Sequence, residues 1–468
     1  MDELCFTPAT DLTTMVRSKA LSPVELLQAV QNNIERQEPS LNALAAHVPD
    51  QAMEAAKRAE TAVARNEWQG PLHGIPATIK DFSNTKGIKT ERGSYITKGF
   101  VPDSDAPIVT RLKNAGAIII GKTTTAEFGW KATSHSPLTG ITHNPWRHGH
   151  NAGGSSAGAA VAAAAGYGPL HQGGDAAGSI RLPSHFCGIY GLKPTFGRIP
   201  LVPTDTGDCS AHLGPMTRTV ADAAMMLQVM AGPHPLDQFS CEMEPVRYVE
   251  HLNGWAKGKK IALSLDLGHA RVDPEVKDLV LAAAKVFQDD LGATVTEIVP
   301  EWGKLGPELI RFFWSSHETA HAKHLGQWQD KMDPGLVACI KSAAAYTVTD
   351  YQGMRERKRD YCAAIHRMFQ TWDYLITPTA SVAAFPAHLL QPPDWPQHEW
   401  DWFSWAEFTY PFNFASNPAA SIPCGFTRDG FPVGFQIVGR RFDDLGVLQA
   451  SAAFESVCPW QHKRPPLH

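Results

Sequence analysis

The chain has few cysteines and no long apolar run. Its 8 cysteines in 468 residues include no CxxC pair and no regular spacing, so we expect reduced thiols and no disulfide framework. No apolar stretch approaches the roughly 20 residues that a transmembrane helix needs. Residues 1–12 (MDELCFTPATDL) lack the basic and apolar regions of a secretory signal. These absences predict a cytoplasmic protein that does not enter a membrane.

An excess of charge of one sign is also lacking. Lys and Arg number 42, Asp and Glu number 47, and the formal net charge is −5. This balance gives no electrostatic reason to expect nucleic acid or an anionic membrane as a partner. The partner expected instead is a small-molecule substrate, and a homodimer is left open.

Helix and strand signals alternate along the chain. Ser22–Pro23 is a typical helix start, with serine as the cap and proline at the first helical position. Residues 106–121 (APIVTRLKNAGAIIIG) predict a helix, a turn and a buried strand, which is the unit that builds a layered α/β sheet. Residues 421–439 predict a hairpin with an Asp429–Gly430 turn.

No internal repeat, low-complexity tract or clear linker divides the sequence. A chain of this length can bury a substantial core. We therefore predict a single domain over residues 1–468, with a largely helical insertion around residues 300–370.

Ser179 lies in the run GGDAAGSIRLP, where chemistry is expected. Residues 167–172 predict a buried strand that leads into a turn at Gly173–Gly174, and residues 180–187 predict a helix with Pro183 in its first turn. A serine between a glycine turn and a helix start lies among unpaired backbone N–H groups, which stabilise negative charge.

Two further segments carry candidate residues that accompany Ser179. The run GGSSAG at 153–158 opens an alanine-rich helix, with Ser155 or Ser156 near its cap. A helix so poor in large side chains fits only where its neighbours approach closely, so we expect it at the centre of the fold. Upstream, LHGIPATIKD predicts a short strand ending at Lys80. An isolated lysine there is usually a surface charge, and the two serine segments are what make it a candidate.

These three segments, in this order, resemble the amidase signature family of serine amide hydrolases. The resemblance covers roughly residues 21–215 and 410–448. It implies a mixed β-sheet covered by helices on both faces, and neither a cofactor nor a metal. It also implies a triad of a nucleophilic serine, a serine in a cis peptide and a lysine, which by motif position are Ser179, Ser155 and Lys80.

The resemblance implies further roles around the triad. Backbone N–H groups of Ala176, Ala177, Gly178 and Ser179 would hold the oxyanion. The family's usual run is Thr-Asp-Thr-Gly-Gly-Ser, and this chain has Gly-Asp-Ala-Ala-Gly-Ser. Alanine keeps its N–H but resists positive φ, so pocket shape and substrate choice are the properties that this departure affects. The side chains expected to support the site are those of Ser156, Asp175 and Arg181.

An aromatic segment, residues 391–414, contains four tryptophans. It either packs over the core as a loop or walls an apolar substrate pocket. On the second interpretation Trp402 and Trp405 would line that pocket.

Two other motifs in the sequence indicate alternative chemistries. His317, Glu318 and His321 match the HExxH motif of zinc hydrolases, but His324 stands where the longer zinc-protease pattern has glycine, and no fitting third ligand follows. Residues 154–158 also spell GxSxG, the nucleophile elbow of α/β-hydrolases, which requires a strand directly before it. The preceding residues are rich in turn formers, so we disfavour this second alternative.

The sequence therefore predicts an amidase that hydrolyses the carbon–nitrogen bond of a small, aryl or apolar amide through a serine acyl-enzyme. Some family members are instead glutamine-hydrolysing A subunits of tRNA-dependent amidotransferases, and length and layout permit that role too. A non-catalytic member that keeps only the fold would lack part of the triad. All three positions are filled here.

Overall fold

The computed structural model describes residues 2–204, 210–242 and 246–466. Within these residues, eleven strands form one sheet, and a separate hairpin pairs β4 (His135–Ser136) with β5 (Gly140–Ile141). The strands of the large sheet are β1 (Leu44–His47), β2 (Pro76–Lys80), β3 (Ile118–Thr123), β6 (Leu170–Asp175), β7 (Tyr190–Lys193), β8 (His212–Thr217), β9 (Lys260–Leu263), β10 (Thr294–Glu297), β11 (Tyr374–Pro378), β12 (Ala419–Phe426) and β13 (Pro432–Gly439).

The α-helices are α1 (Asp2–Phe6), α2 (Ala9–Arg17), α3 (Pro23–Leu41), α4 (Pro49–Ala64), α5 (Pro107–Asn114), α6 (Ala157–Ala164), α7 (Arg181–Cys187), α8 (Val220–Met230), α9 (Pro274–Asp289), α10 (Gly306–Glu318), α11 (Leu325–Trp328), α12 (Pro334–Ser342), α13 (Val348–Met368), α14 (Pro411–Phe414) and α15 (Asp444–Val457). Ser22 caps α3, as its sequence predicted, because its side chain accepts hydrogen bonds from the first-turn amides.

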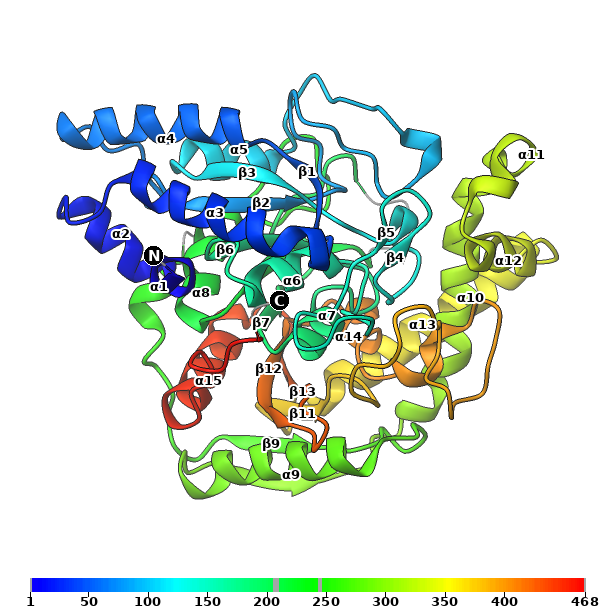
Figure 1. The fold of residues 1–468 in the computed structure, drawn as a ribbon. Coiled ribbons are helices and arrows are strands. Elements are labelled where there is room, and N and C mark those ends of the chain that lie inside the picture. The colour runs from blue at the N-terminus through cyan, green and yellow to red at the C-terminus, as the bar shows by residue number, and fades with distance from the viewer. Residues whose placement is uncertain (1, 205–209, 243–245, 467–468) are drawn as a thin grey trace.

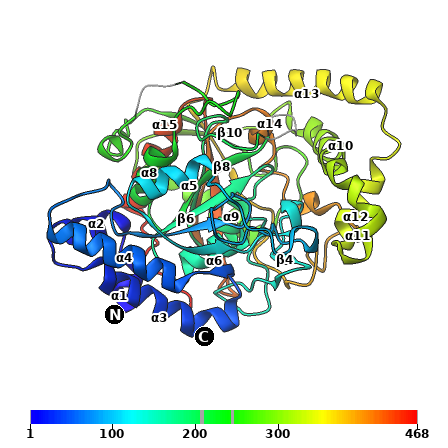
Figure 2. The ribbon, with the colours of Figure 1, turned by 90° about the horizontal axis from the view of Figure 1, so that it is seen from above.

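The sheet is mixed, with the strand order β1-β3-β2-β6-β8-β7-β12-β13-β11-β9-β10. β2 lies between β3 and β6 and runs parallel to both, whereas β6 and β8 are antiparallel. Helices cover both faces of this sheet: α5 and α8 lie on one side of β6 and β8, and α6 and α3 lie on the other (Figure 2). The predicted α/β class and mixed sheet are confirmed.

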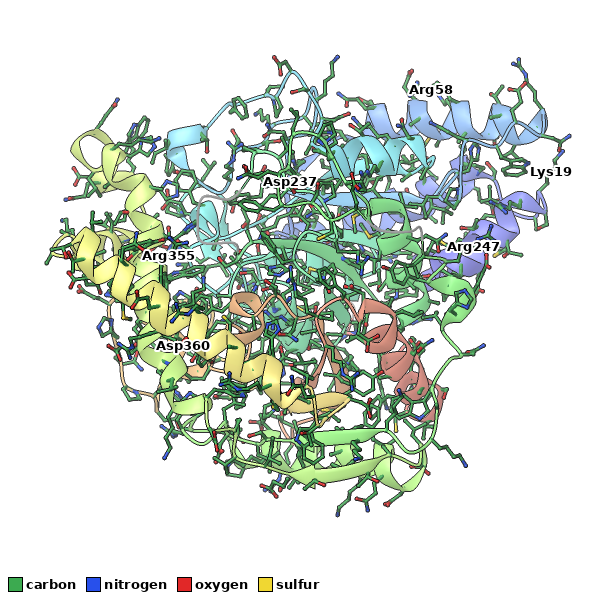
Figure 3. The ribbon with its side chains drawn as sticks, turned by 180° about the vertical axis from the view of Figure 1, so that it is seen from behind. Lys19, Arg58, Asp237, Arg247, Arg355 and Asp360 are labelled. Atoms are coloured by element: carbon green, nitrogen blue, oxygen red, sulfur yellow. The ribbon has the colours of Figure 1, made fainter. Side chains whose placement is uncertain are left out.

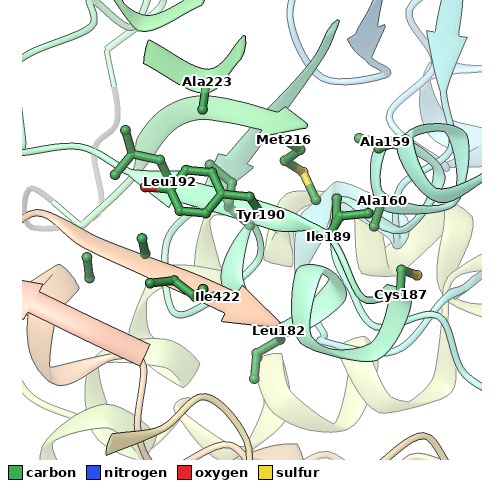
Figure 4. Close-up of a cluster of buried hydrophobic side chains, with 14 of the residues drawn as sticks. Ala159, Ala160, Leu182, Cys187, Ile189, Tyr190, Leu192, Met216, Ala223 and Ile422 are labelled. Atoms are coloured by element: carbon green, nitrogen blue, oxygen red, sulfur yellow. The ribbon is translucent and has the colours of Figure 1, made fainter. Parts of the chain in front are cut away.

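Helix α6 occupies the centre of the fold, as its composition predicted. All of its residues are buried, and it contacts β2, β3, β6, β8 and α7. A Cβ on Gly158 would come within 2.2 Å of Ala43 O and 2.4 Å of Thr124 N, so no larger residue fits there. Ala159 and Ala160 of this helix pack with Ile189, Tyr190 and Met216 in the apolar cluster (Figure 4). Small residues thus bring the serine segment against the strands that carry the other candidate groups.

Residues 306–368 form a group of helices, α10 to α13, at one end of the molecule (Figures 1 and 2). The predicted helical character of this segment is confirmed, while the single-domain organisation stays a prediction. α13 carries exposed charged residues such as Arg355 and Asp360 along its outer side (Figure 3). In the described ranges, no helix combines the length and the apolar character that crossing a membrane requires.

One local prediction is wrong. Gly173 and Gly174 do not form a turn but continue β6, which pairs with β8 through Asp175 and His212. The physical reason is space, because a Cβ on Gly173 would lie 2.6 Å from Met216 Sδ. The glycines therefore allow close packing within the sheet, and the chain turns only after Asp175.

Candidate active site

Lys80 lies at the end of β2, where the two parallel neighbours of this strand also end. Its side chain is buried, at 3% exposed, and Nζ lies 2.7 Å from Ser155 Oγ and 3.5 Å from the carbonyl oxygen of Gly174. Burial lowers the Lys80 pKa from 10.5 to about 7, and the nearby Asp175 carboxylate opposes this shift. A lysine with a pKa near 7 can give and take protons at neutral pH.

Ser155 follows a cis peptide bond with Gly154, as the resemblance implied, and its Oγ accepts the hydrogen bond from Lys80. The residue that faces it is Gly129, which has φ +79° and whose Cβ, if present, would lie 3.2 Å from Ser155 Oγ. Gly129 thus leaves space beside the Ser155 hydroxyl. Sequence reasoning missed this residue, because nothing in the local pattern connects it with Ser155, 26 residues further along the chain.

Ser179 lies between β6 and α7 and is buried, at 4% exposed. Its carbonyl oxygen accepts a hydrogen bond from the Ser156 amide at 3.2 Å, which ties the two serine segments together. The Ser156 hydroxyl also donates to the carbonyl of Gly174 at 3.0 Å. Among the described residues, the Ser179 hydroxyl has no protein hydrogen-bond partner. The structure thus joins Lys80 to Ser155 directly, and Ser179 to this pair through the backbone.

The loop that carries Ser179 is fixed by a fully buried ion pair. Arg181 donates to both Asp175 oxygens, with Nη2 2.9 Å from Oδ1 and Nε 3.0 Å from Oδ2. Burial alone would raise the Asp175 pKa, but the charge and hydrogen bonds of Arg181 hold it well below its usual range. Asn413 donates to the same carboxylate at 2.9 Å. Asp175 and Arg181, predicted to support the site, therefore contact each other, and Asn413 is a partner that the sequence did not indicate.

The backbone amides of this loop differ in what they bind. The Gly178 amide donates to Asp175 Oδ1 at 2.7 Å, so this one of the four predicted oxyanion donors is already occupied. In the described part of the chain, the amides of Ala176, Ala177 and Ser179 donate to no protein acceptor. Gly178 has φ +129°, and a Cβ there would lie 2.4 Å from Thr409 Oγ1, so the loop requires glycine at this position.

A cavity of about 230 Å³ opens beside Ala176. Aromatic side chains of α10 line it together with neighbours from α13 and α14; the lining residues are Ala176, Ser210, Ile310, Phe313, Trp314, Ser316, His317, Thr319, Ala320, Tyr351 and Phe414. Such a mixture of apolar walls and few polar groups is typical of small-molecule sites.

Trp402 and Trp405, which the sequence predicts to line a substrate pocket, do not line this cavity. Both are buried, at 1% and 0% exposed, and neither lines this cavity. Their indole N–H groups donate to backbone carbonyls, Trp402 to Trp130 at 3.0 Å and Trp405 to Leu390 at 3.0 Å. Trp402 packs edge-to-face on the cavity residue Trp314, with ring centroids 5.5 Å apart. The tryptophan segment therefore supports the wall from behind.

The HExxH segment does not form the helix face that zinc binding needs. α10 ends at Glu318 and residues 319–324 form a 3-10 helix, in which residues four apart no longer share a face. His317 lines the cavity, whereas His321 stacks on Phe128 with ring centroids 4.1 Å apart. Across the described residues, no three His, Cys, Asp or Glu side chains are grouped to hold a metal ion.

Comparisons with known proteins agree with this geometry. Residues 25–448 match the Amidase family. The chain is 38% identical to an acylamidase of Rhodococcus erythropolis, covering 98% of this chain and 96% of that one. It is 34% identical to the A subunit of the glutamyl-tRNA(Gln) amidotransferase of Geobacillus thermodenitrificans, covering 98% of each.

Solved structures give the same result. A bacterial aryl acylamidase of the amidase signature family matches with a TM-score of 0.90 and 29% identity, over 98% of this chain and 97% of that one. A 6-aminohexanoate cyclic dimer hydrolase matches with a TM-score of 0.90 and 29% identity, over 99% of each chain. The chain therefore belongs to the Amidase family, the amidase signature enzymes. It is a hydrolase of carbon–nitrogen amide bonds, as the sequence predicted.

Proposed function

We propose that this amidase works through an acyl-enzyme on Ser179, with Ser155 and Lys80 moving the protons. The Ser179 hydroxyl attacks the amide carbonyl carbon and passes its proton to Ser155 Oγ, whose own proton goes to neutral Lys80. A hydroxyl donates and accepts at once, which suits Ser155 to this relay. Lys80 then returns a proton through Ser155 to the leaving amine, and the C–N bond breaks. Water attacks the acyl ester by the same route, releasing the acid and restoring Ser179.

The observation that carries this proposal is the 2.7 Å contact between Lys80 Nζ and Ser155 Oγ in a buried site. An ordinary lysine, with a pKa of about 10.4, is neutral in only roughly one molecule in two thousand at pH 7, a penalty of about 4–5 kcal/mol. With a pKa of about 7, roughly half of the Lys80 side chains are neutral at that pH, and most of this penalty disappears.

The negative oxygen of the tetrahedral intermediate needs donors that are not already used. The amides of Ala176, Ala177 and Ser179 meet this condition, and the Gly178 amide does not because it binds Asp175. We therefore assign the oxyanion hole to those three amides. Preorganised donors of this kind contribute about 2.7–4 kcal/mol each to the transition state.

The substrate class that fits best is a small aryl or apolar amide. Ala176, at the start of the oxyanion loop, also lines the cavity whose walls include Phe313, Trp314 and Phe414. The similarity to an acylamidase and to an aryl acylamidase points the same way. The second candidate is the amidotransferase role, which rests on the 34% identity to the Geobacillus chain, and release of ammonia from glutamine would favour it. The cytoplasmic location and a homodimer stay predictions.

A panel of amides tests the proposal on wild type, Ser179→Ala and Lys80→Met, each with and without a chelator. We expect both variants to lose at least about 10³-fold in kcat/KM, and chelation to change nothing. Activity that survives in Ser179→Ala and disappears on chelation would overturn the serine mechanism in favour of a metal.

A further inference from the structure

The cavity beside Ala176 is lined by both apolar and polar side chains. Ile310, Phe313 and Trp314 come from α10, and Tyr351 and Phe414 complete an apolar wall. On α10, residues 310, 313, 314 and 317 fall at the spacing of one helix face. His317 therefore takes the fourth position on this face, where the pattern of the other three residues would place another apolar side chain.

His317 is half-buried and lines the cavity, and its ring lies beside Trp314, with ring centroids 6.2 Å apart. The hydroxyl of the next residue along the chain, Ser316, is buried and without a hydrogen-bond partner in the described chain. Buried polar groups in native proteins are normally paired, and an unpaired one is costly. The buried Ser316 hydroxyl and the half-buried His317 imidazole, both lining the cavity, are suited to a polar group of a bound molecule.

The charges around His317 select the kind of group. None of the lining residues in the described chain is acidic. Lys323, His321 and His324 follow on the same segment, and burial together with the charges of His317, His324 and Lys323 lowers the His321 pKa to about 4. Burial is the larger cause of this shift and disfavours charge of either sign. The preference for a negative ligand group therefore rests on the imidazole of His317, which can donate a hydrogen bond, and on the lack of acidic lining residues in the described chain.

The size of the cavity limits the rest of the ligand. An apolar cavity of about 150 Å³ is enough to hold benzene. The roughly 230 Å³ found here leaves space for one ring and a substituent. Phe313 and Phe414 pack edge-to-face, with ring centroids 5.8 Å apart, so they form one wall against which such a ring would lie.

We propose that His317 is a specificity-determining residue, which binds a carboxylate carried at the far end of an apolar or aromatic arm of the amide substrate. This inference rests on the proposed function, because it takes the cavity to be part of the substrate site. It gives the imidazole of the HExxH segment a role in recognition that requires no metal.

The test compares amides that differ only in the far substituent. One series carries it on the amine ring (4-acetamidobenzoate against 4-isopropylacetanilide), and the other on the acyl ring (4-carbamoylbenzoate against 4-isopropylbenzamide). In one of the two series, wild type should prefer the carboxylate by about 10-fold or more in kcat/KM, since hydrogen bonds to charged groups are the strong ones. The series that responds identifies the arm that enters the cavity.

His317→Leu should abolish this preference, mainly through KM, and His317→Gln, which keeps a donor, should retain part of it. His388→Leu, at an exposed histidine outside the cavity, is the matched control and should leave the ratio unchanged. A ratio that is the same within twofold in wild type and His317→Leu, or a wild-type preference for isopropyl in both series, overturns the inference.

The Ser179→Ala variant distinguishes a failure of the His317 assignment from a failure of the acyl-enzyme mechanism. If Ser179→Ala is inactive, and the ratio of kcat/KM between carboxylate and isopropyl substrates is the same in wild type and His317→Leu, only the assignment of His317 is wrong. If Ser179→Ala still turns over both series, the proposed mechanism itself fails.

Discussion

Lys80 and Lys122 lie on neighbouring parallel strands, β2 and β3, where Lys122 is paired with Ile79. Both ammonium groups are buried, and burial lowers the pKa of each. Their partners differ. Lys122 Nζ donates to the Ser83 carbonyl and to the hydroxyls of Thr85 and Thr90, the latter two at 3.0 Å, and the Asp81 charge opposes its shift.

Lys80 has one close hydrogen-bond partner, Ser155 Oγ, and a distant one at 3.5 Å. Three fixed acceptors hold Lys122 in place, which suits a lysine that stabilises the fold. One hydroxyl that can pass on a proton suits a lysine that acts in the reaction. A lowered pKa therefore does not by itself identify a catalytic lysine. The hydrogen-bond partners of the ammonium group distinguish the two lysines.

The largest expected effect comes from replacing each lysine by methionine, which keeps the length and removes the charge. Lys80→Met should lose at least about 10³-fold in kcat/KM and keep its folded structure, because only the proton acceptor is gone. Lys122→Met should keep kcat per folded molecule and lose about 3–5 kcal/mol of unfolding free energy, since it leaves three buried acceptors without their donor and removes the charge that favours the ionised Asp81. Kinetics and denaturant unfolding of both variants check this. Equal activity losses would remove the distinction between the two lysines.

The pH profile should follow Lys80. Burial lowers its pKa from 10.5 to about 7, so the neutral form that accepts the proton dominates above pH 7 and disappears below it. We expect kcat/KM to fall about tenfold per pH unit below 7 and to level off above it. Lys122→Met should show the same acid limb, because Lys122 takes no part in the reaction. A limb with its midpoint near pH 10 would contradict the assignment.

Crowding of Ser155 should have a moderate effect. In Gly129→Ala the new Cβ lies 3.2 Å from Ser155 Oγ, so the relay hydroxyl must move, and kcat should fall by about tenfold. Gly87→Ala is the matched control, because Gly87 has a similar φ of +76° and no atom within 4 Å of the added Cβ. Both variants pay a backbone penalty of about 1 kcal/mol. If kcat falls equally in both, the effect is conformational and not specific to Ser155.

The smallest effect is expected from a change around Lys122, the lysine with three fixed acceptors. Thr90→Val removes one of the three acceptors of Lys122 Nζ and should cost about 1 kcal/mol of unfolding free energy. Steady-state kinetics should stay within twofold of wild type. A larger change in kcat would mean that the Lys122 cluster is coupled to the reaction.

Sequence patterns predicted much of this architecture. The strand ending at Lys80, the central alanine-rich helix and the helix after Ser179 are all present, because periodicity and capping act over a few residues. Glycine usually marks a turn, and the sequence therefore predicts a turn at Gly173–Gly174. In the structure, glycine is required at position 173 because Met216 packs against it across the sheet. Tertiary contacts of that kind leave no local signal.

The candidate site was likewise predictable only in part from the sequence. Motif order indicated Lys80, Ser155 and Ser179, but not that Asp175 occupies the Gly178 amide, nor that Asn413 joins the ion pair. Tryptophan content predicts a wall formed by Trp402 and Trp405, whereas the cavity beside Ala176 is lined by Ile310, Phe313 and Trp314 of α10. Which apolar face meets a cavity depends on how the helix docks, and composition does not record that.

The most direct test of the account is to identify the acylated residue during turnover. Wild type quenched with acid while hydrolysing an aryl amide is digested, and its peptides are mapped by mass spectrometry. The account predicts one acyl group on Ser179, absent when Lys80→Met is treated in the same way. An acyl group on another residue, or its formation at the wild-type rate in Lys80→Met, would contradict it.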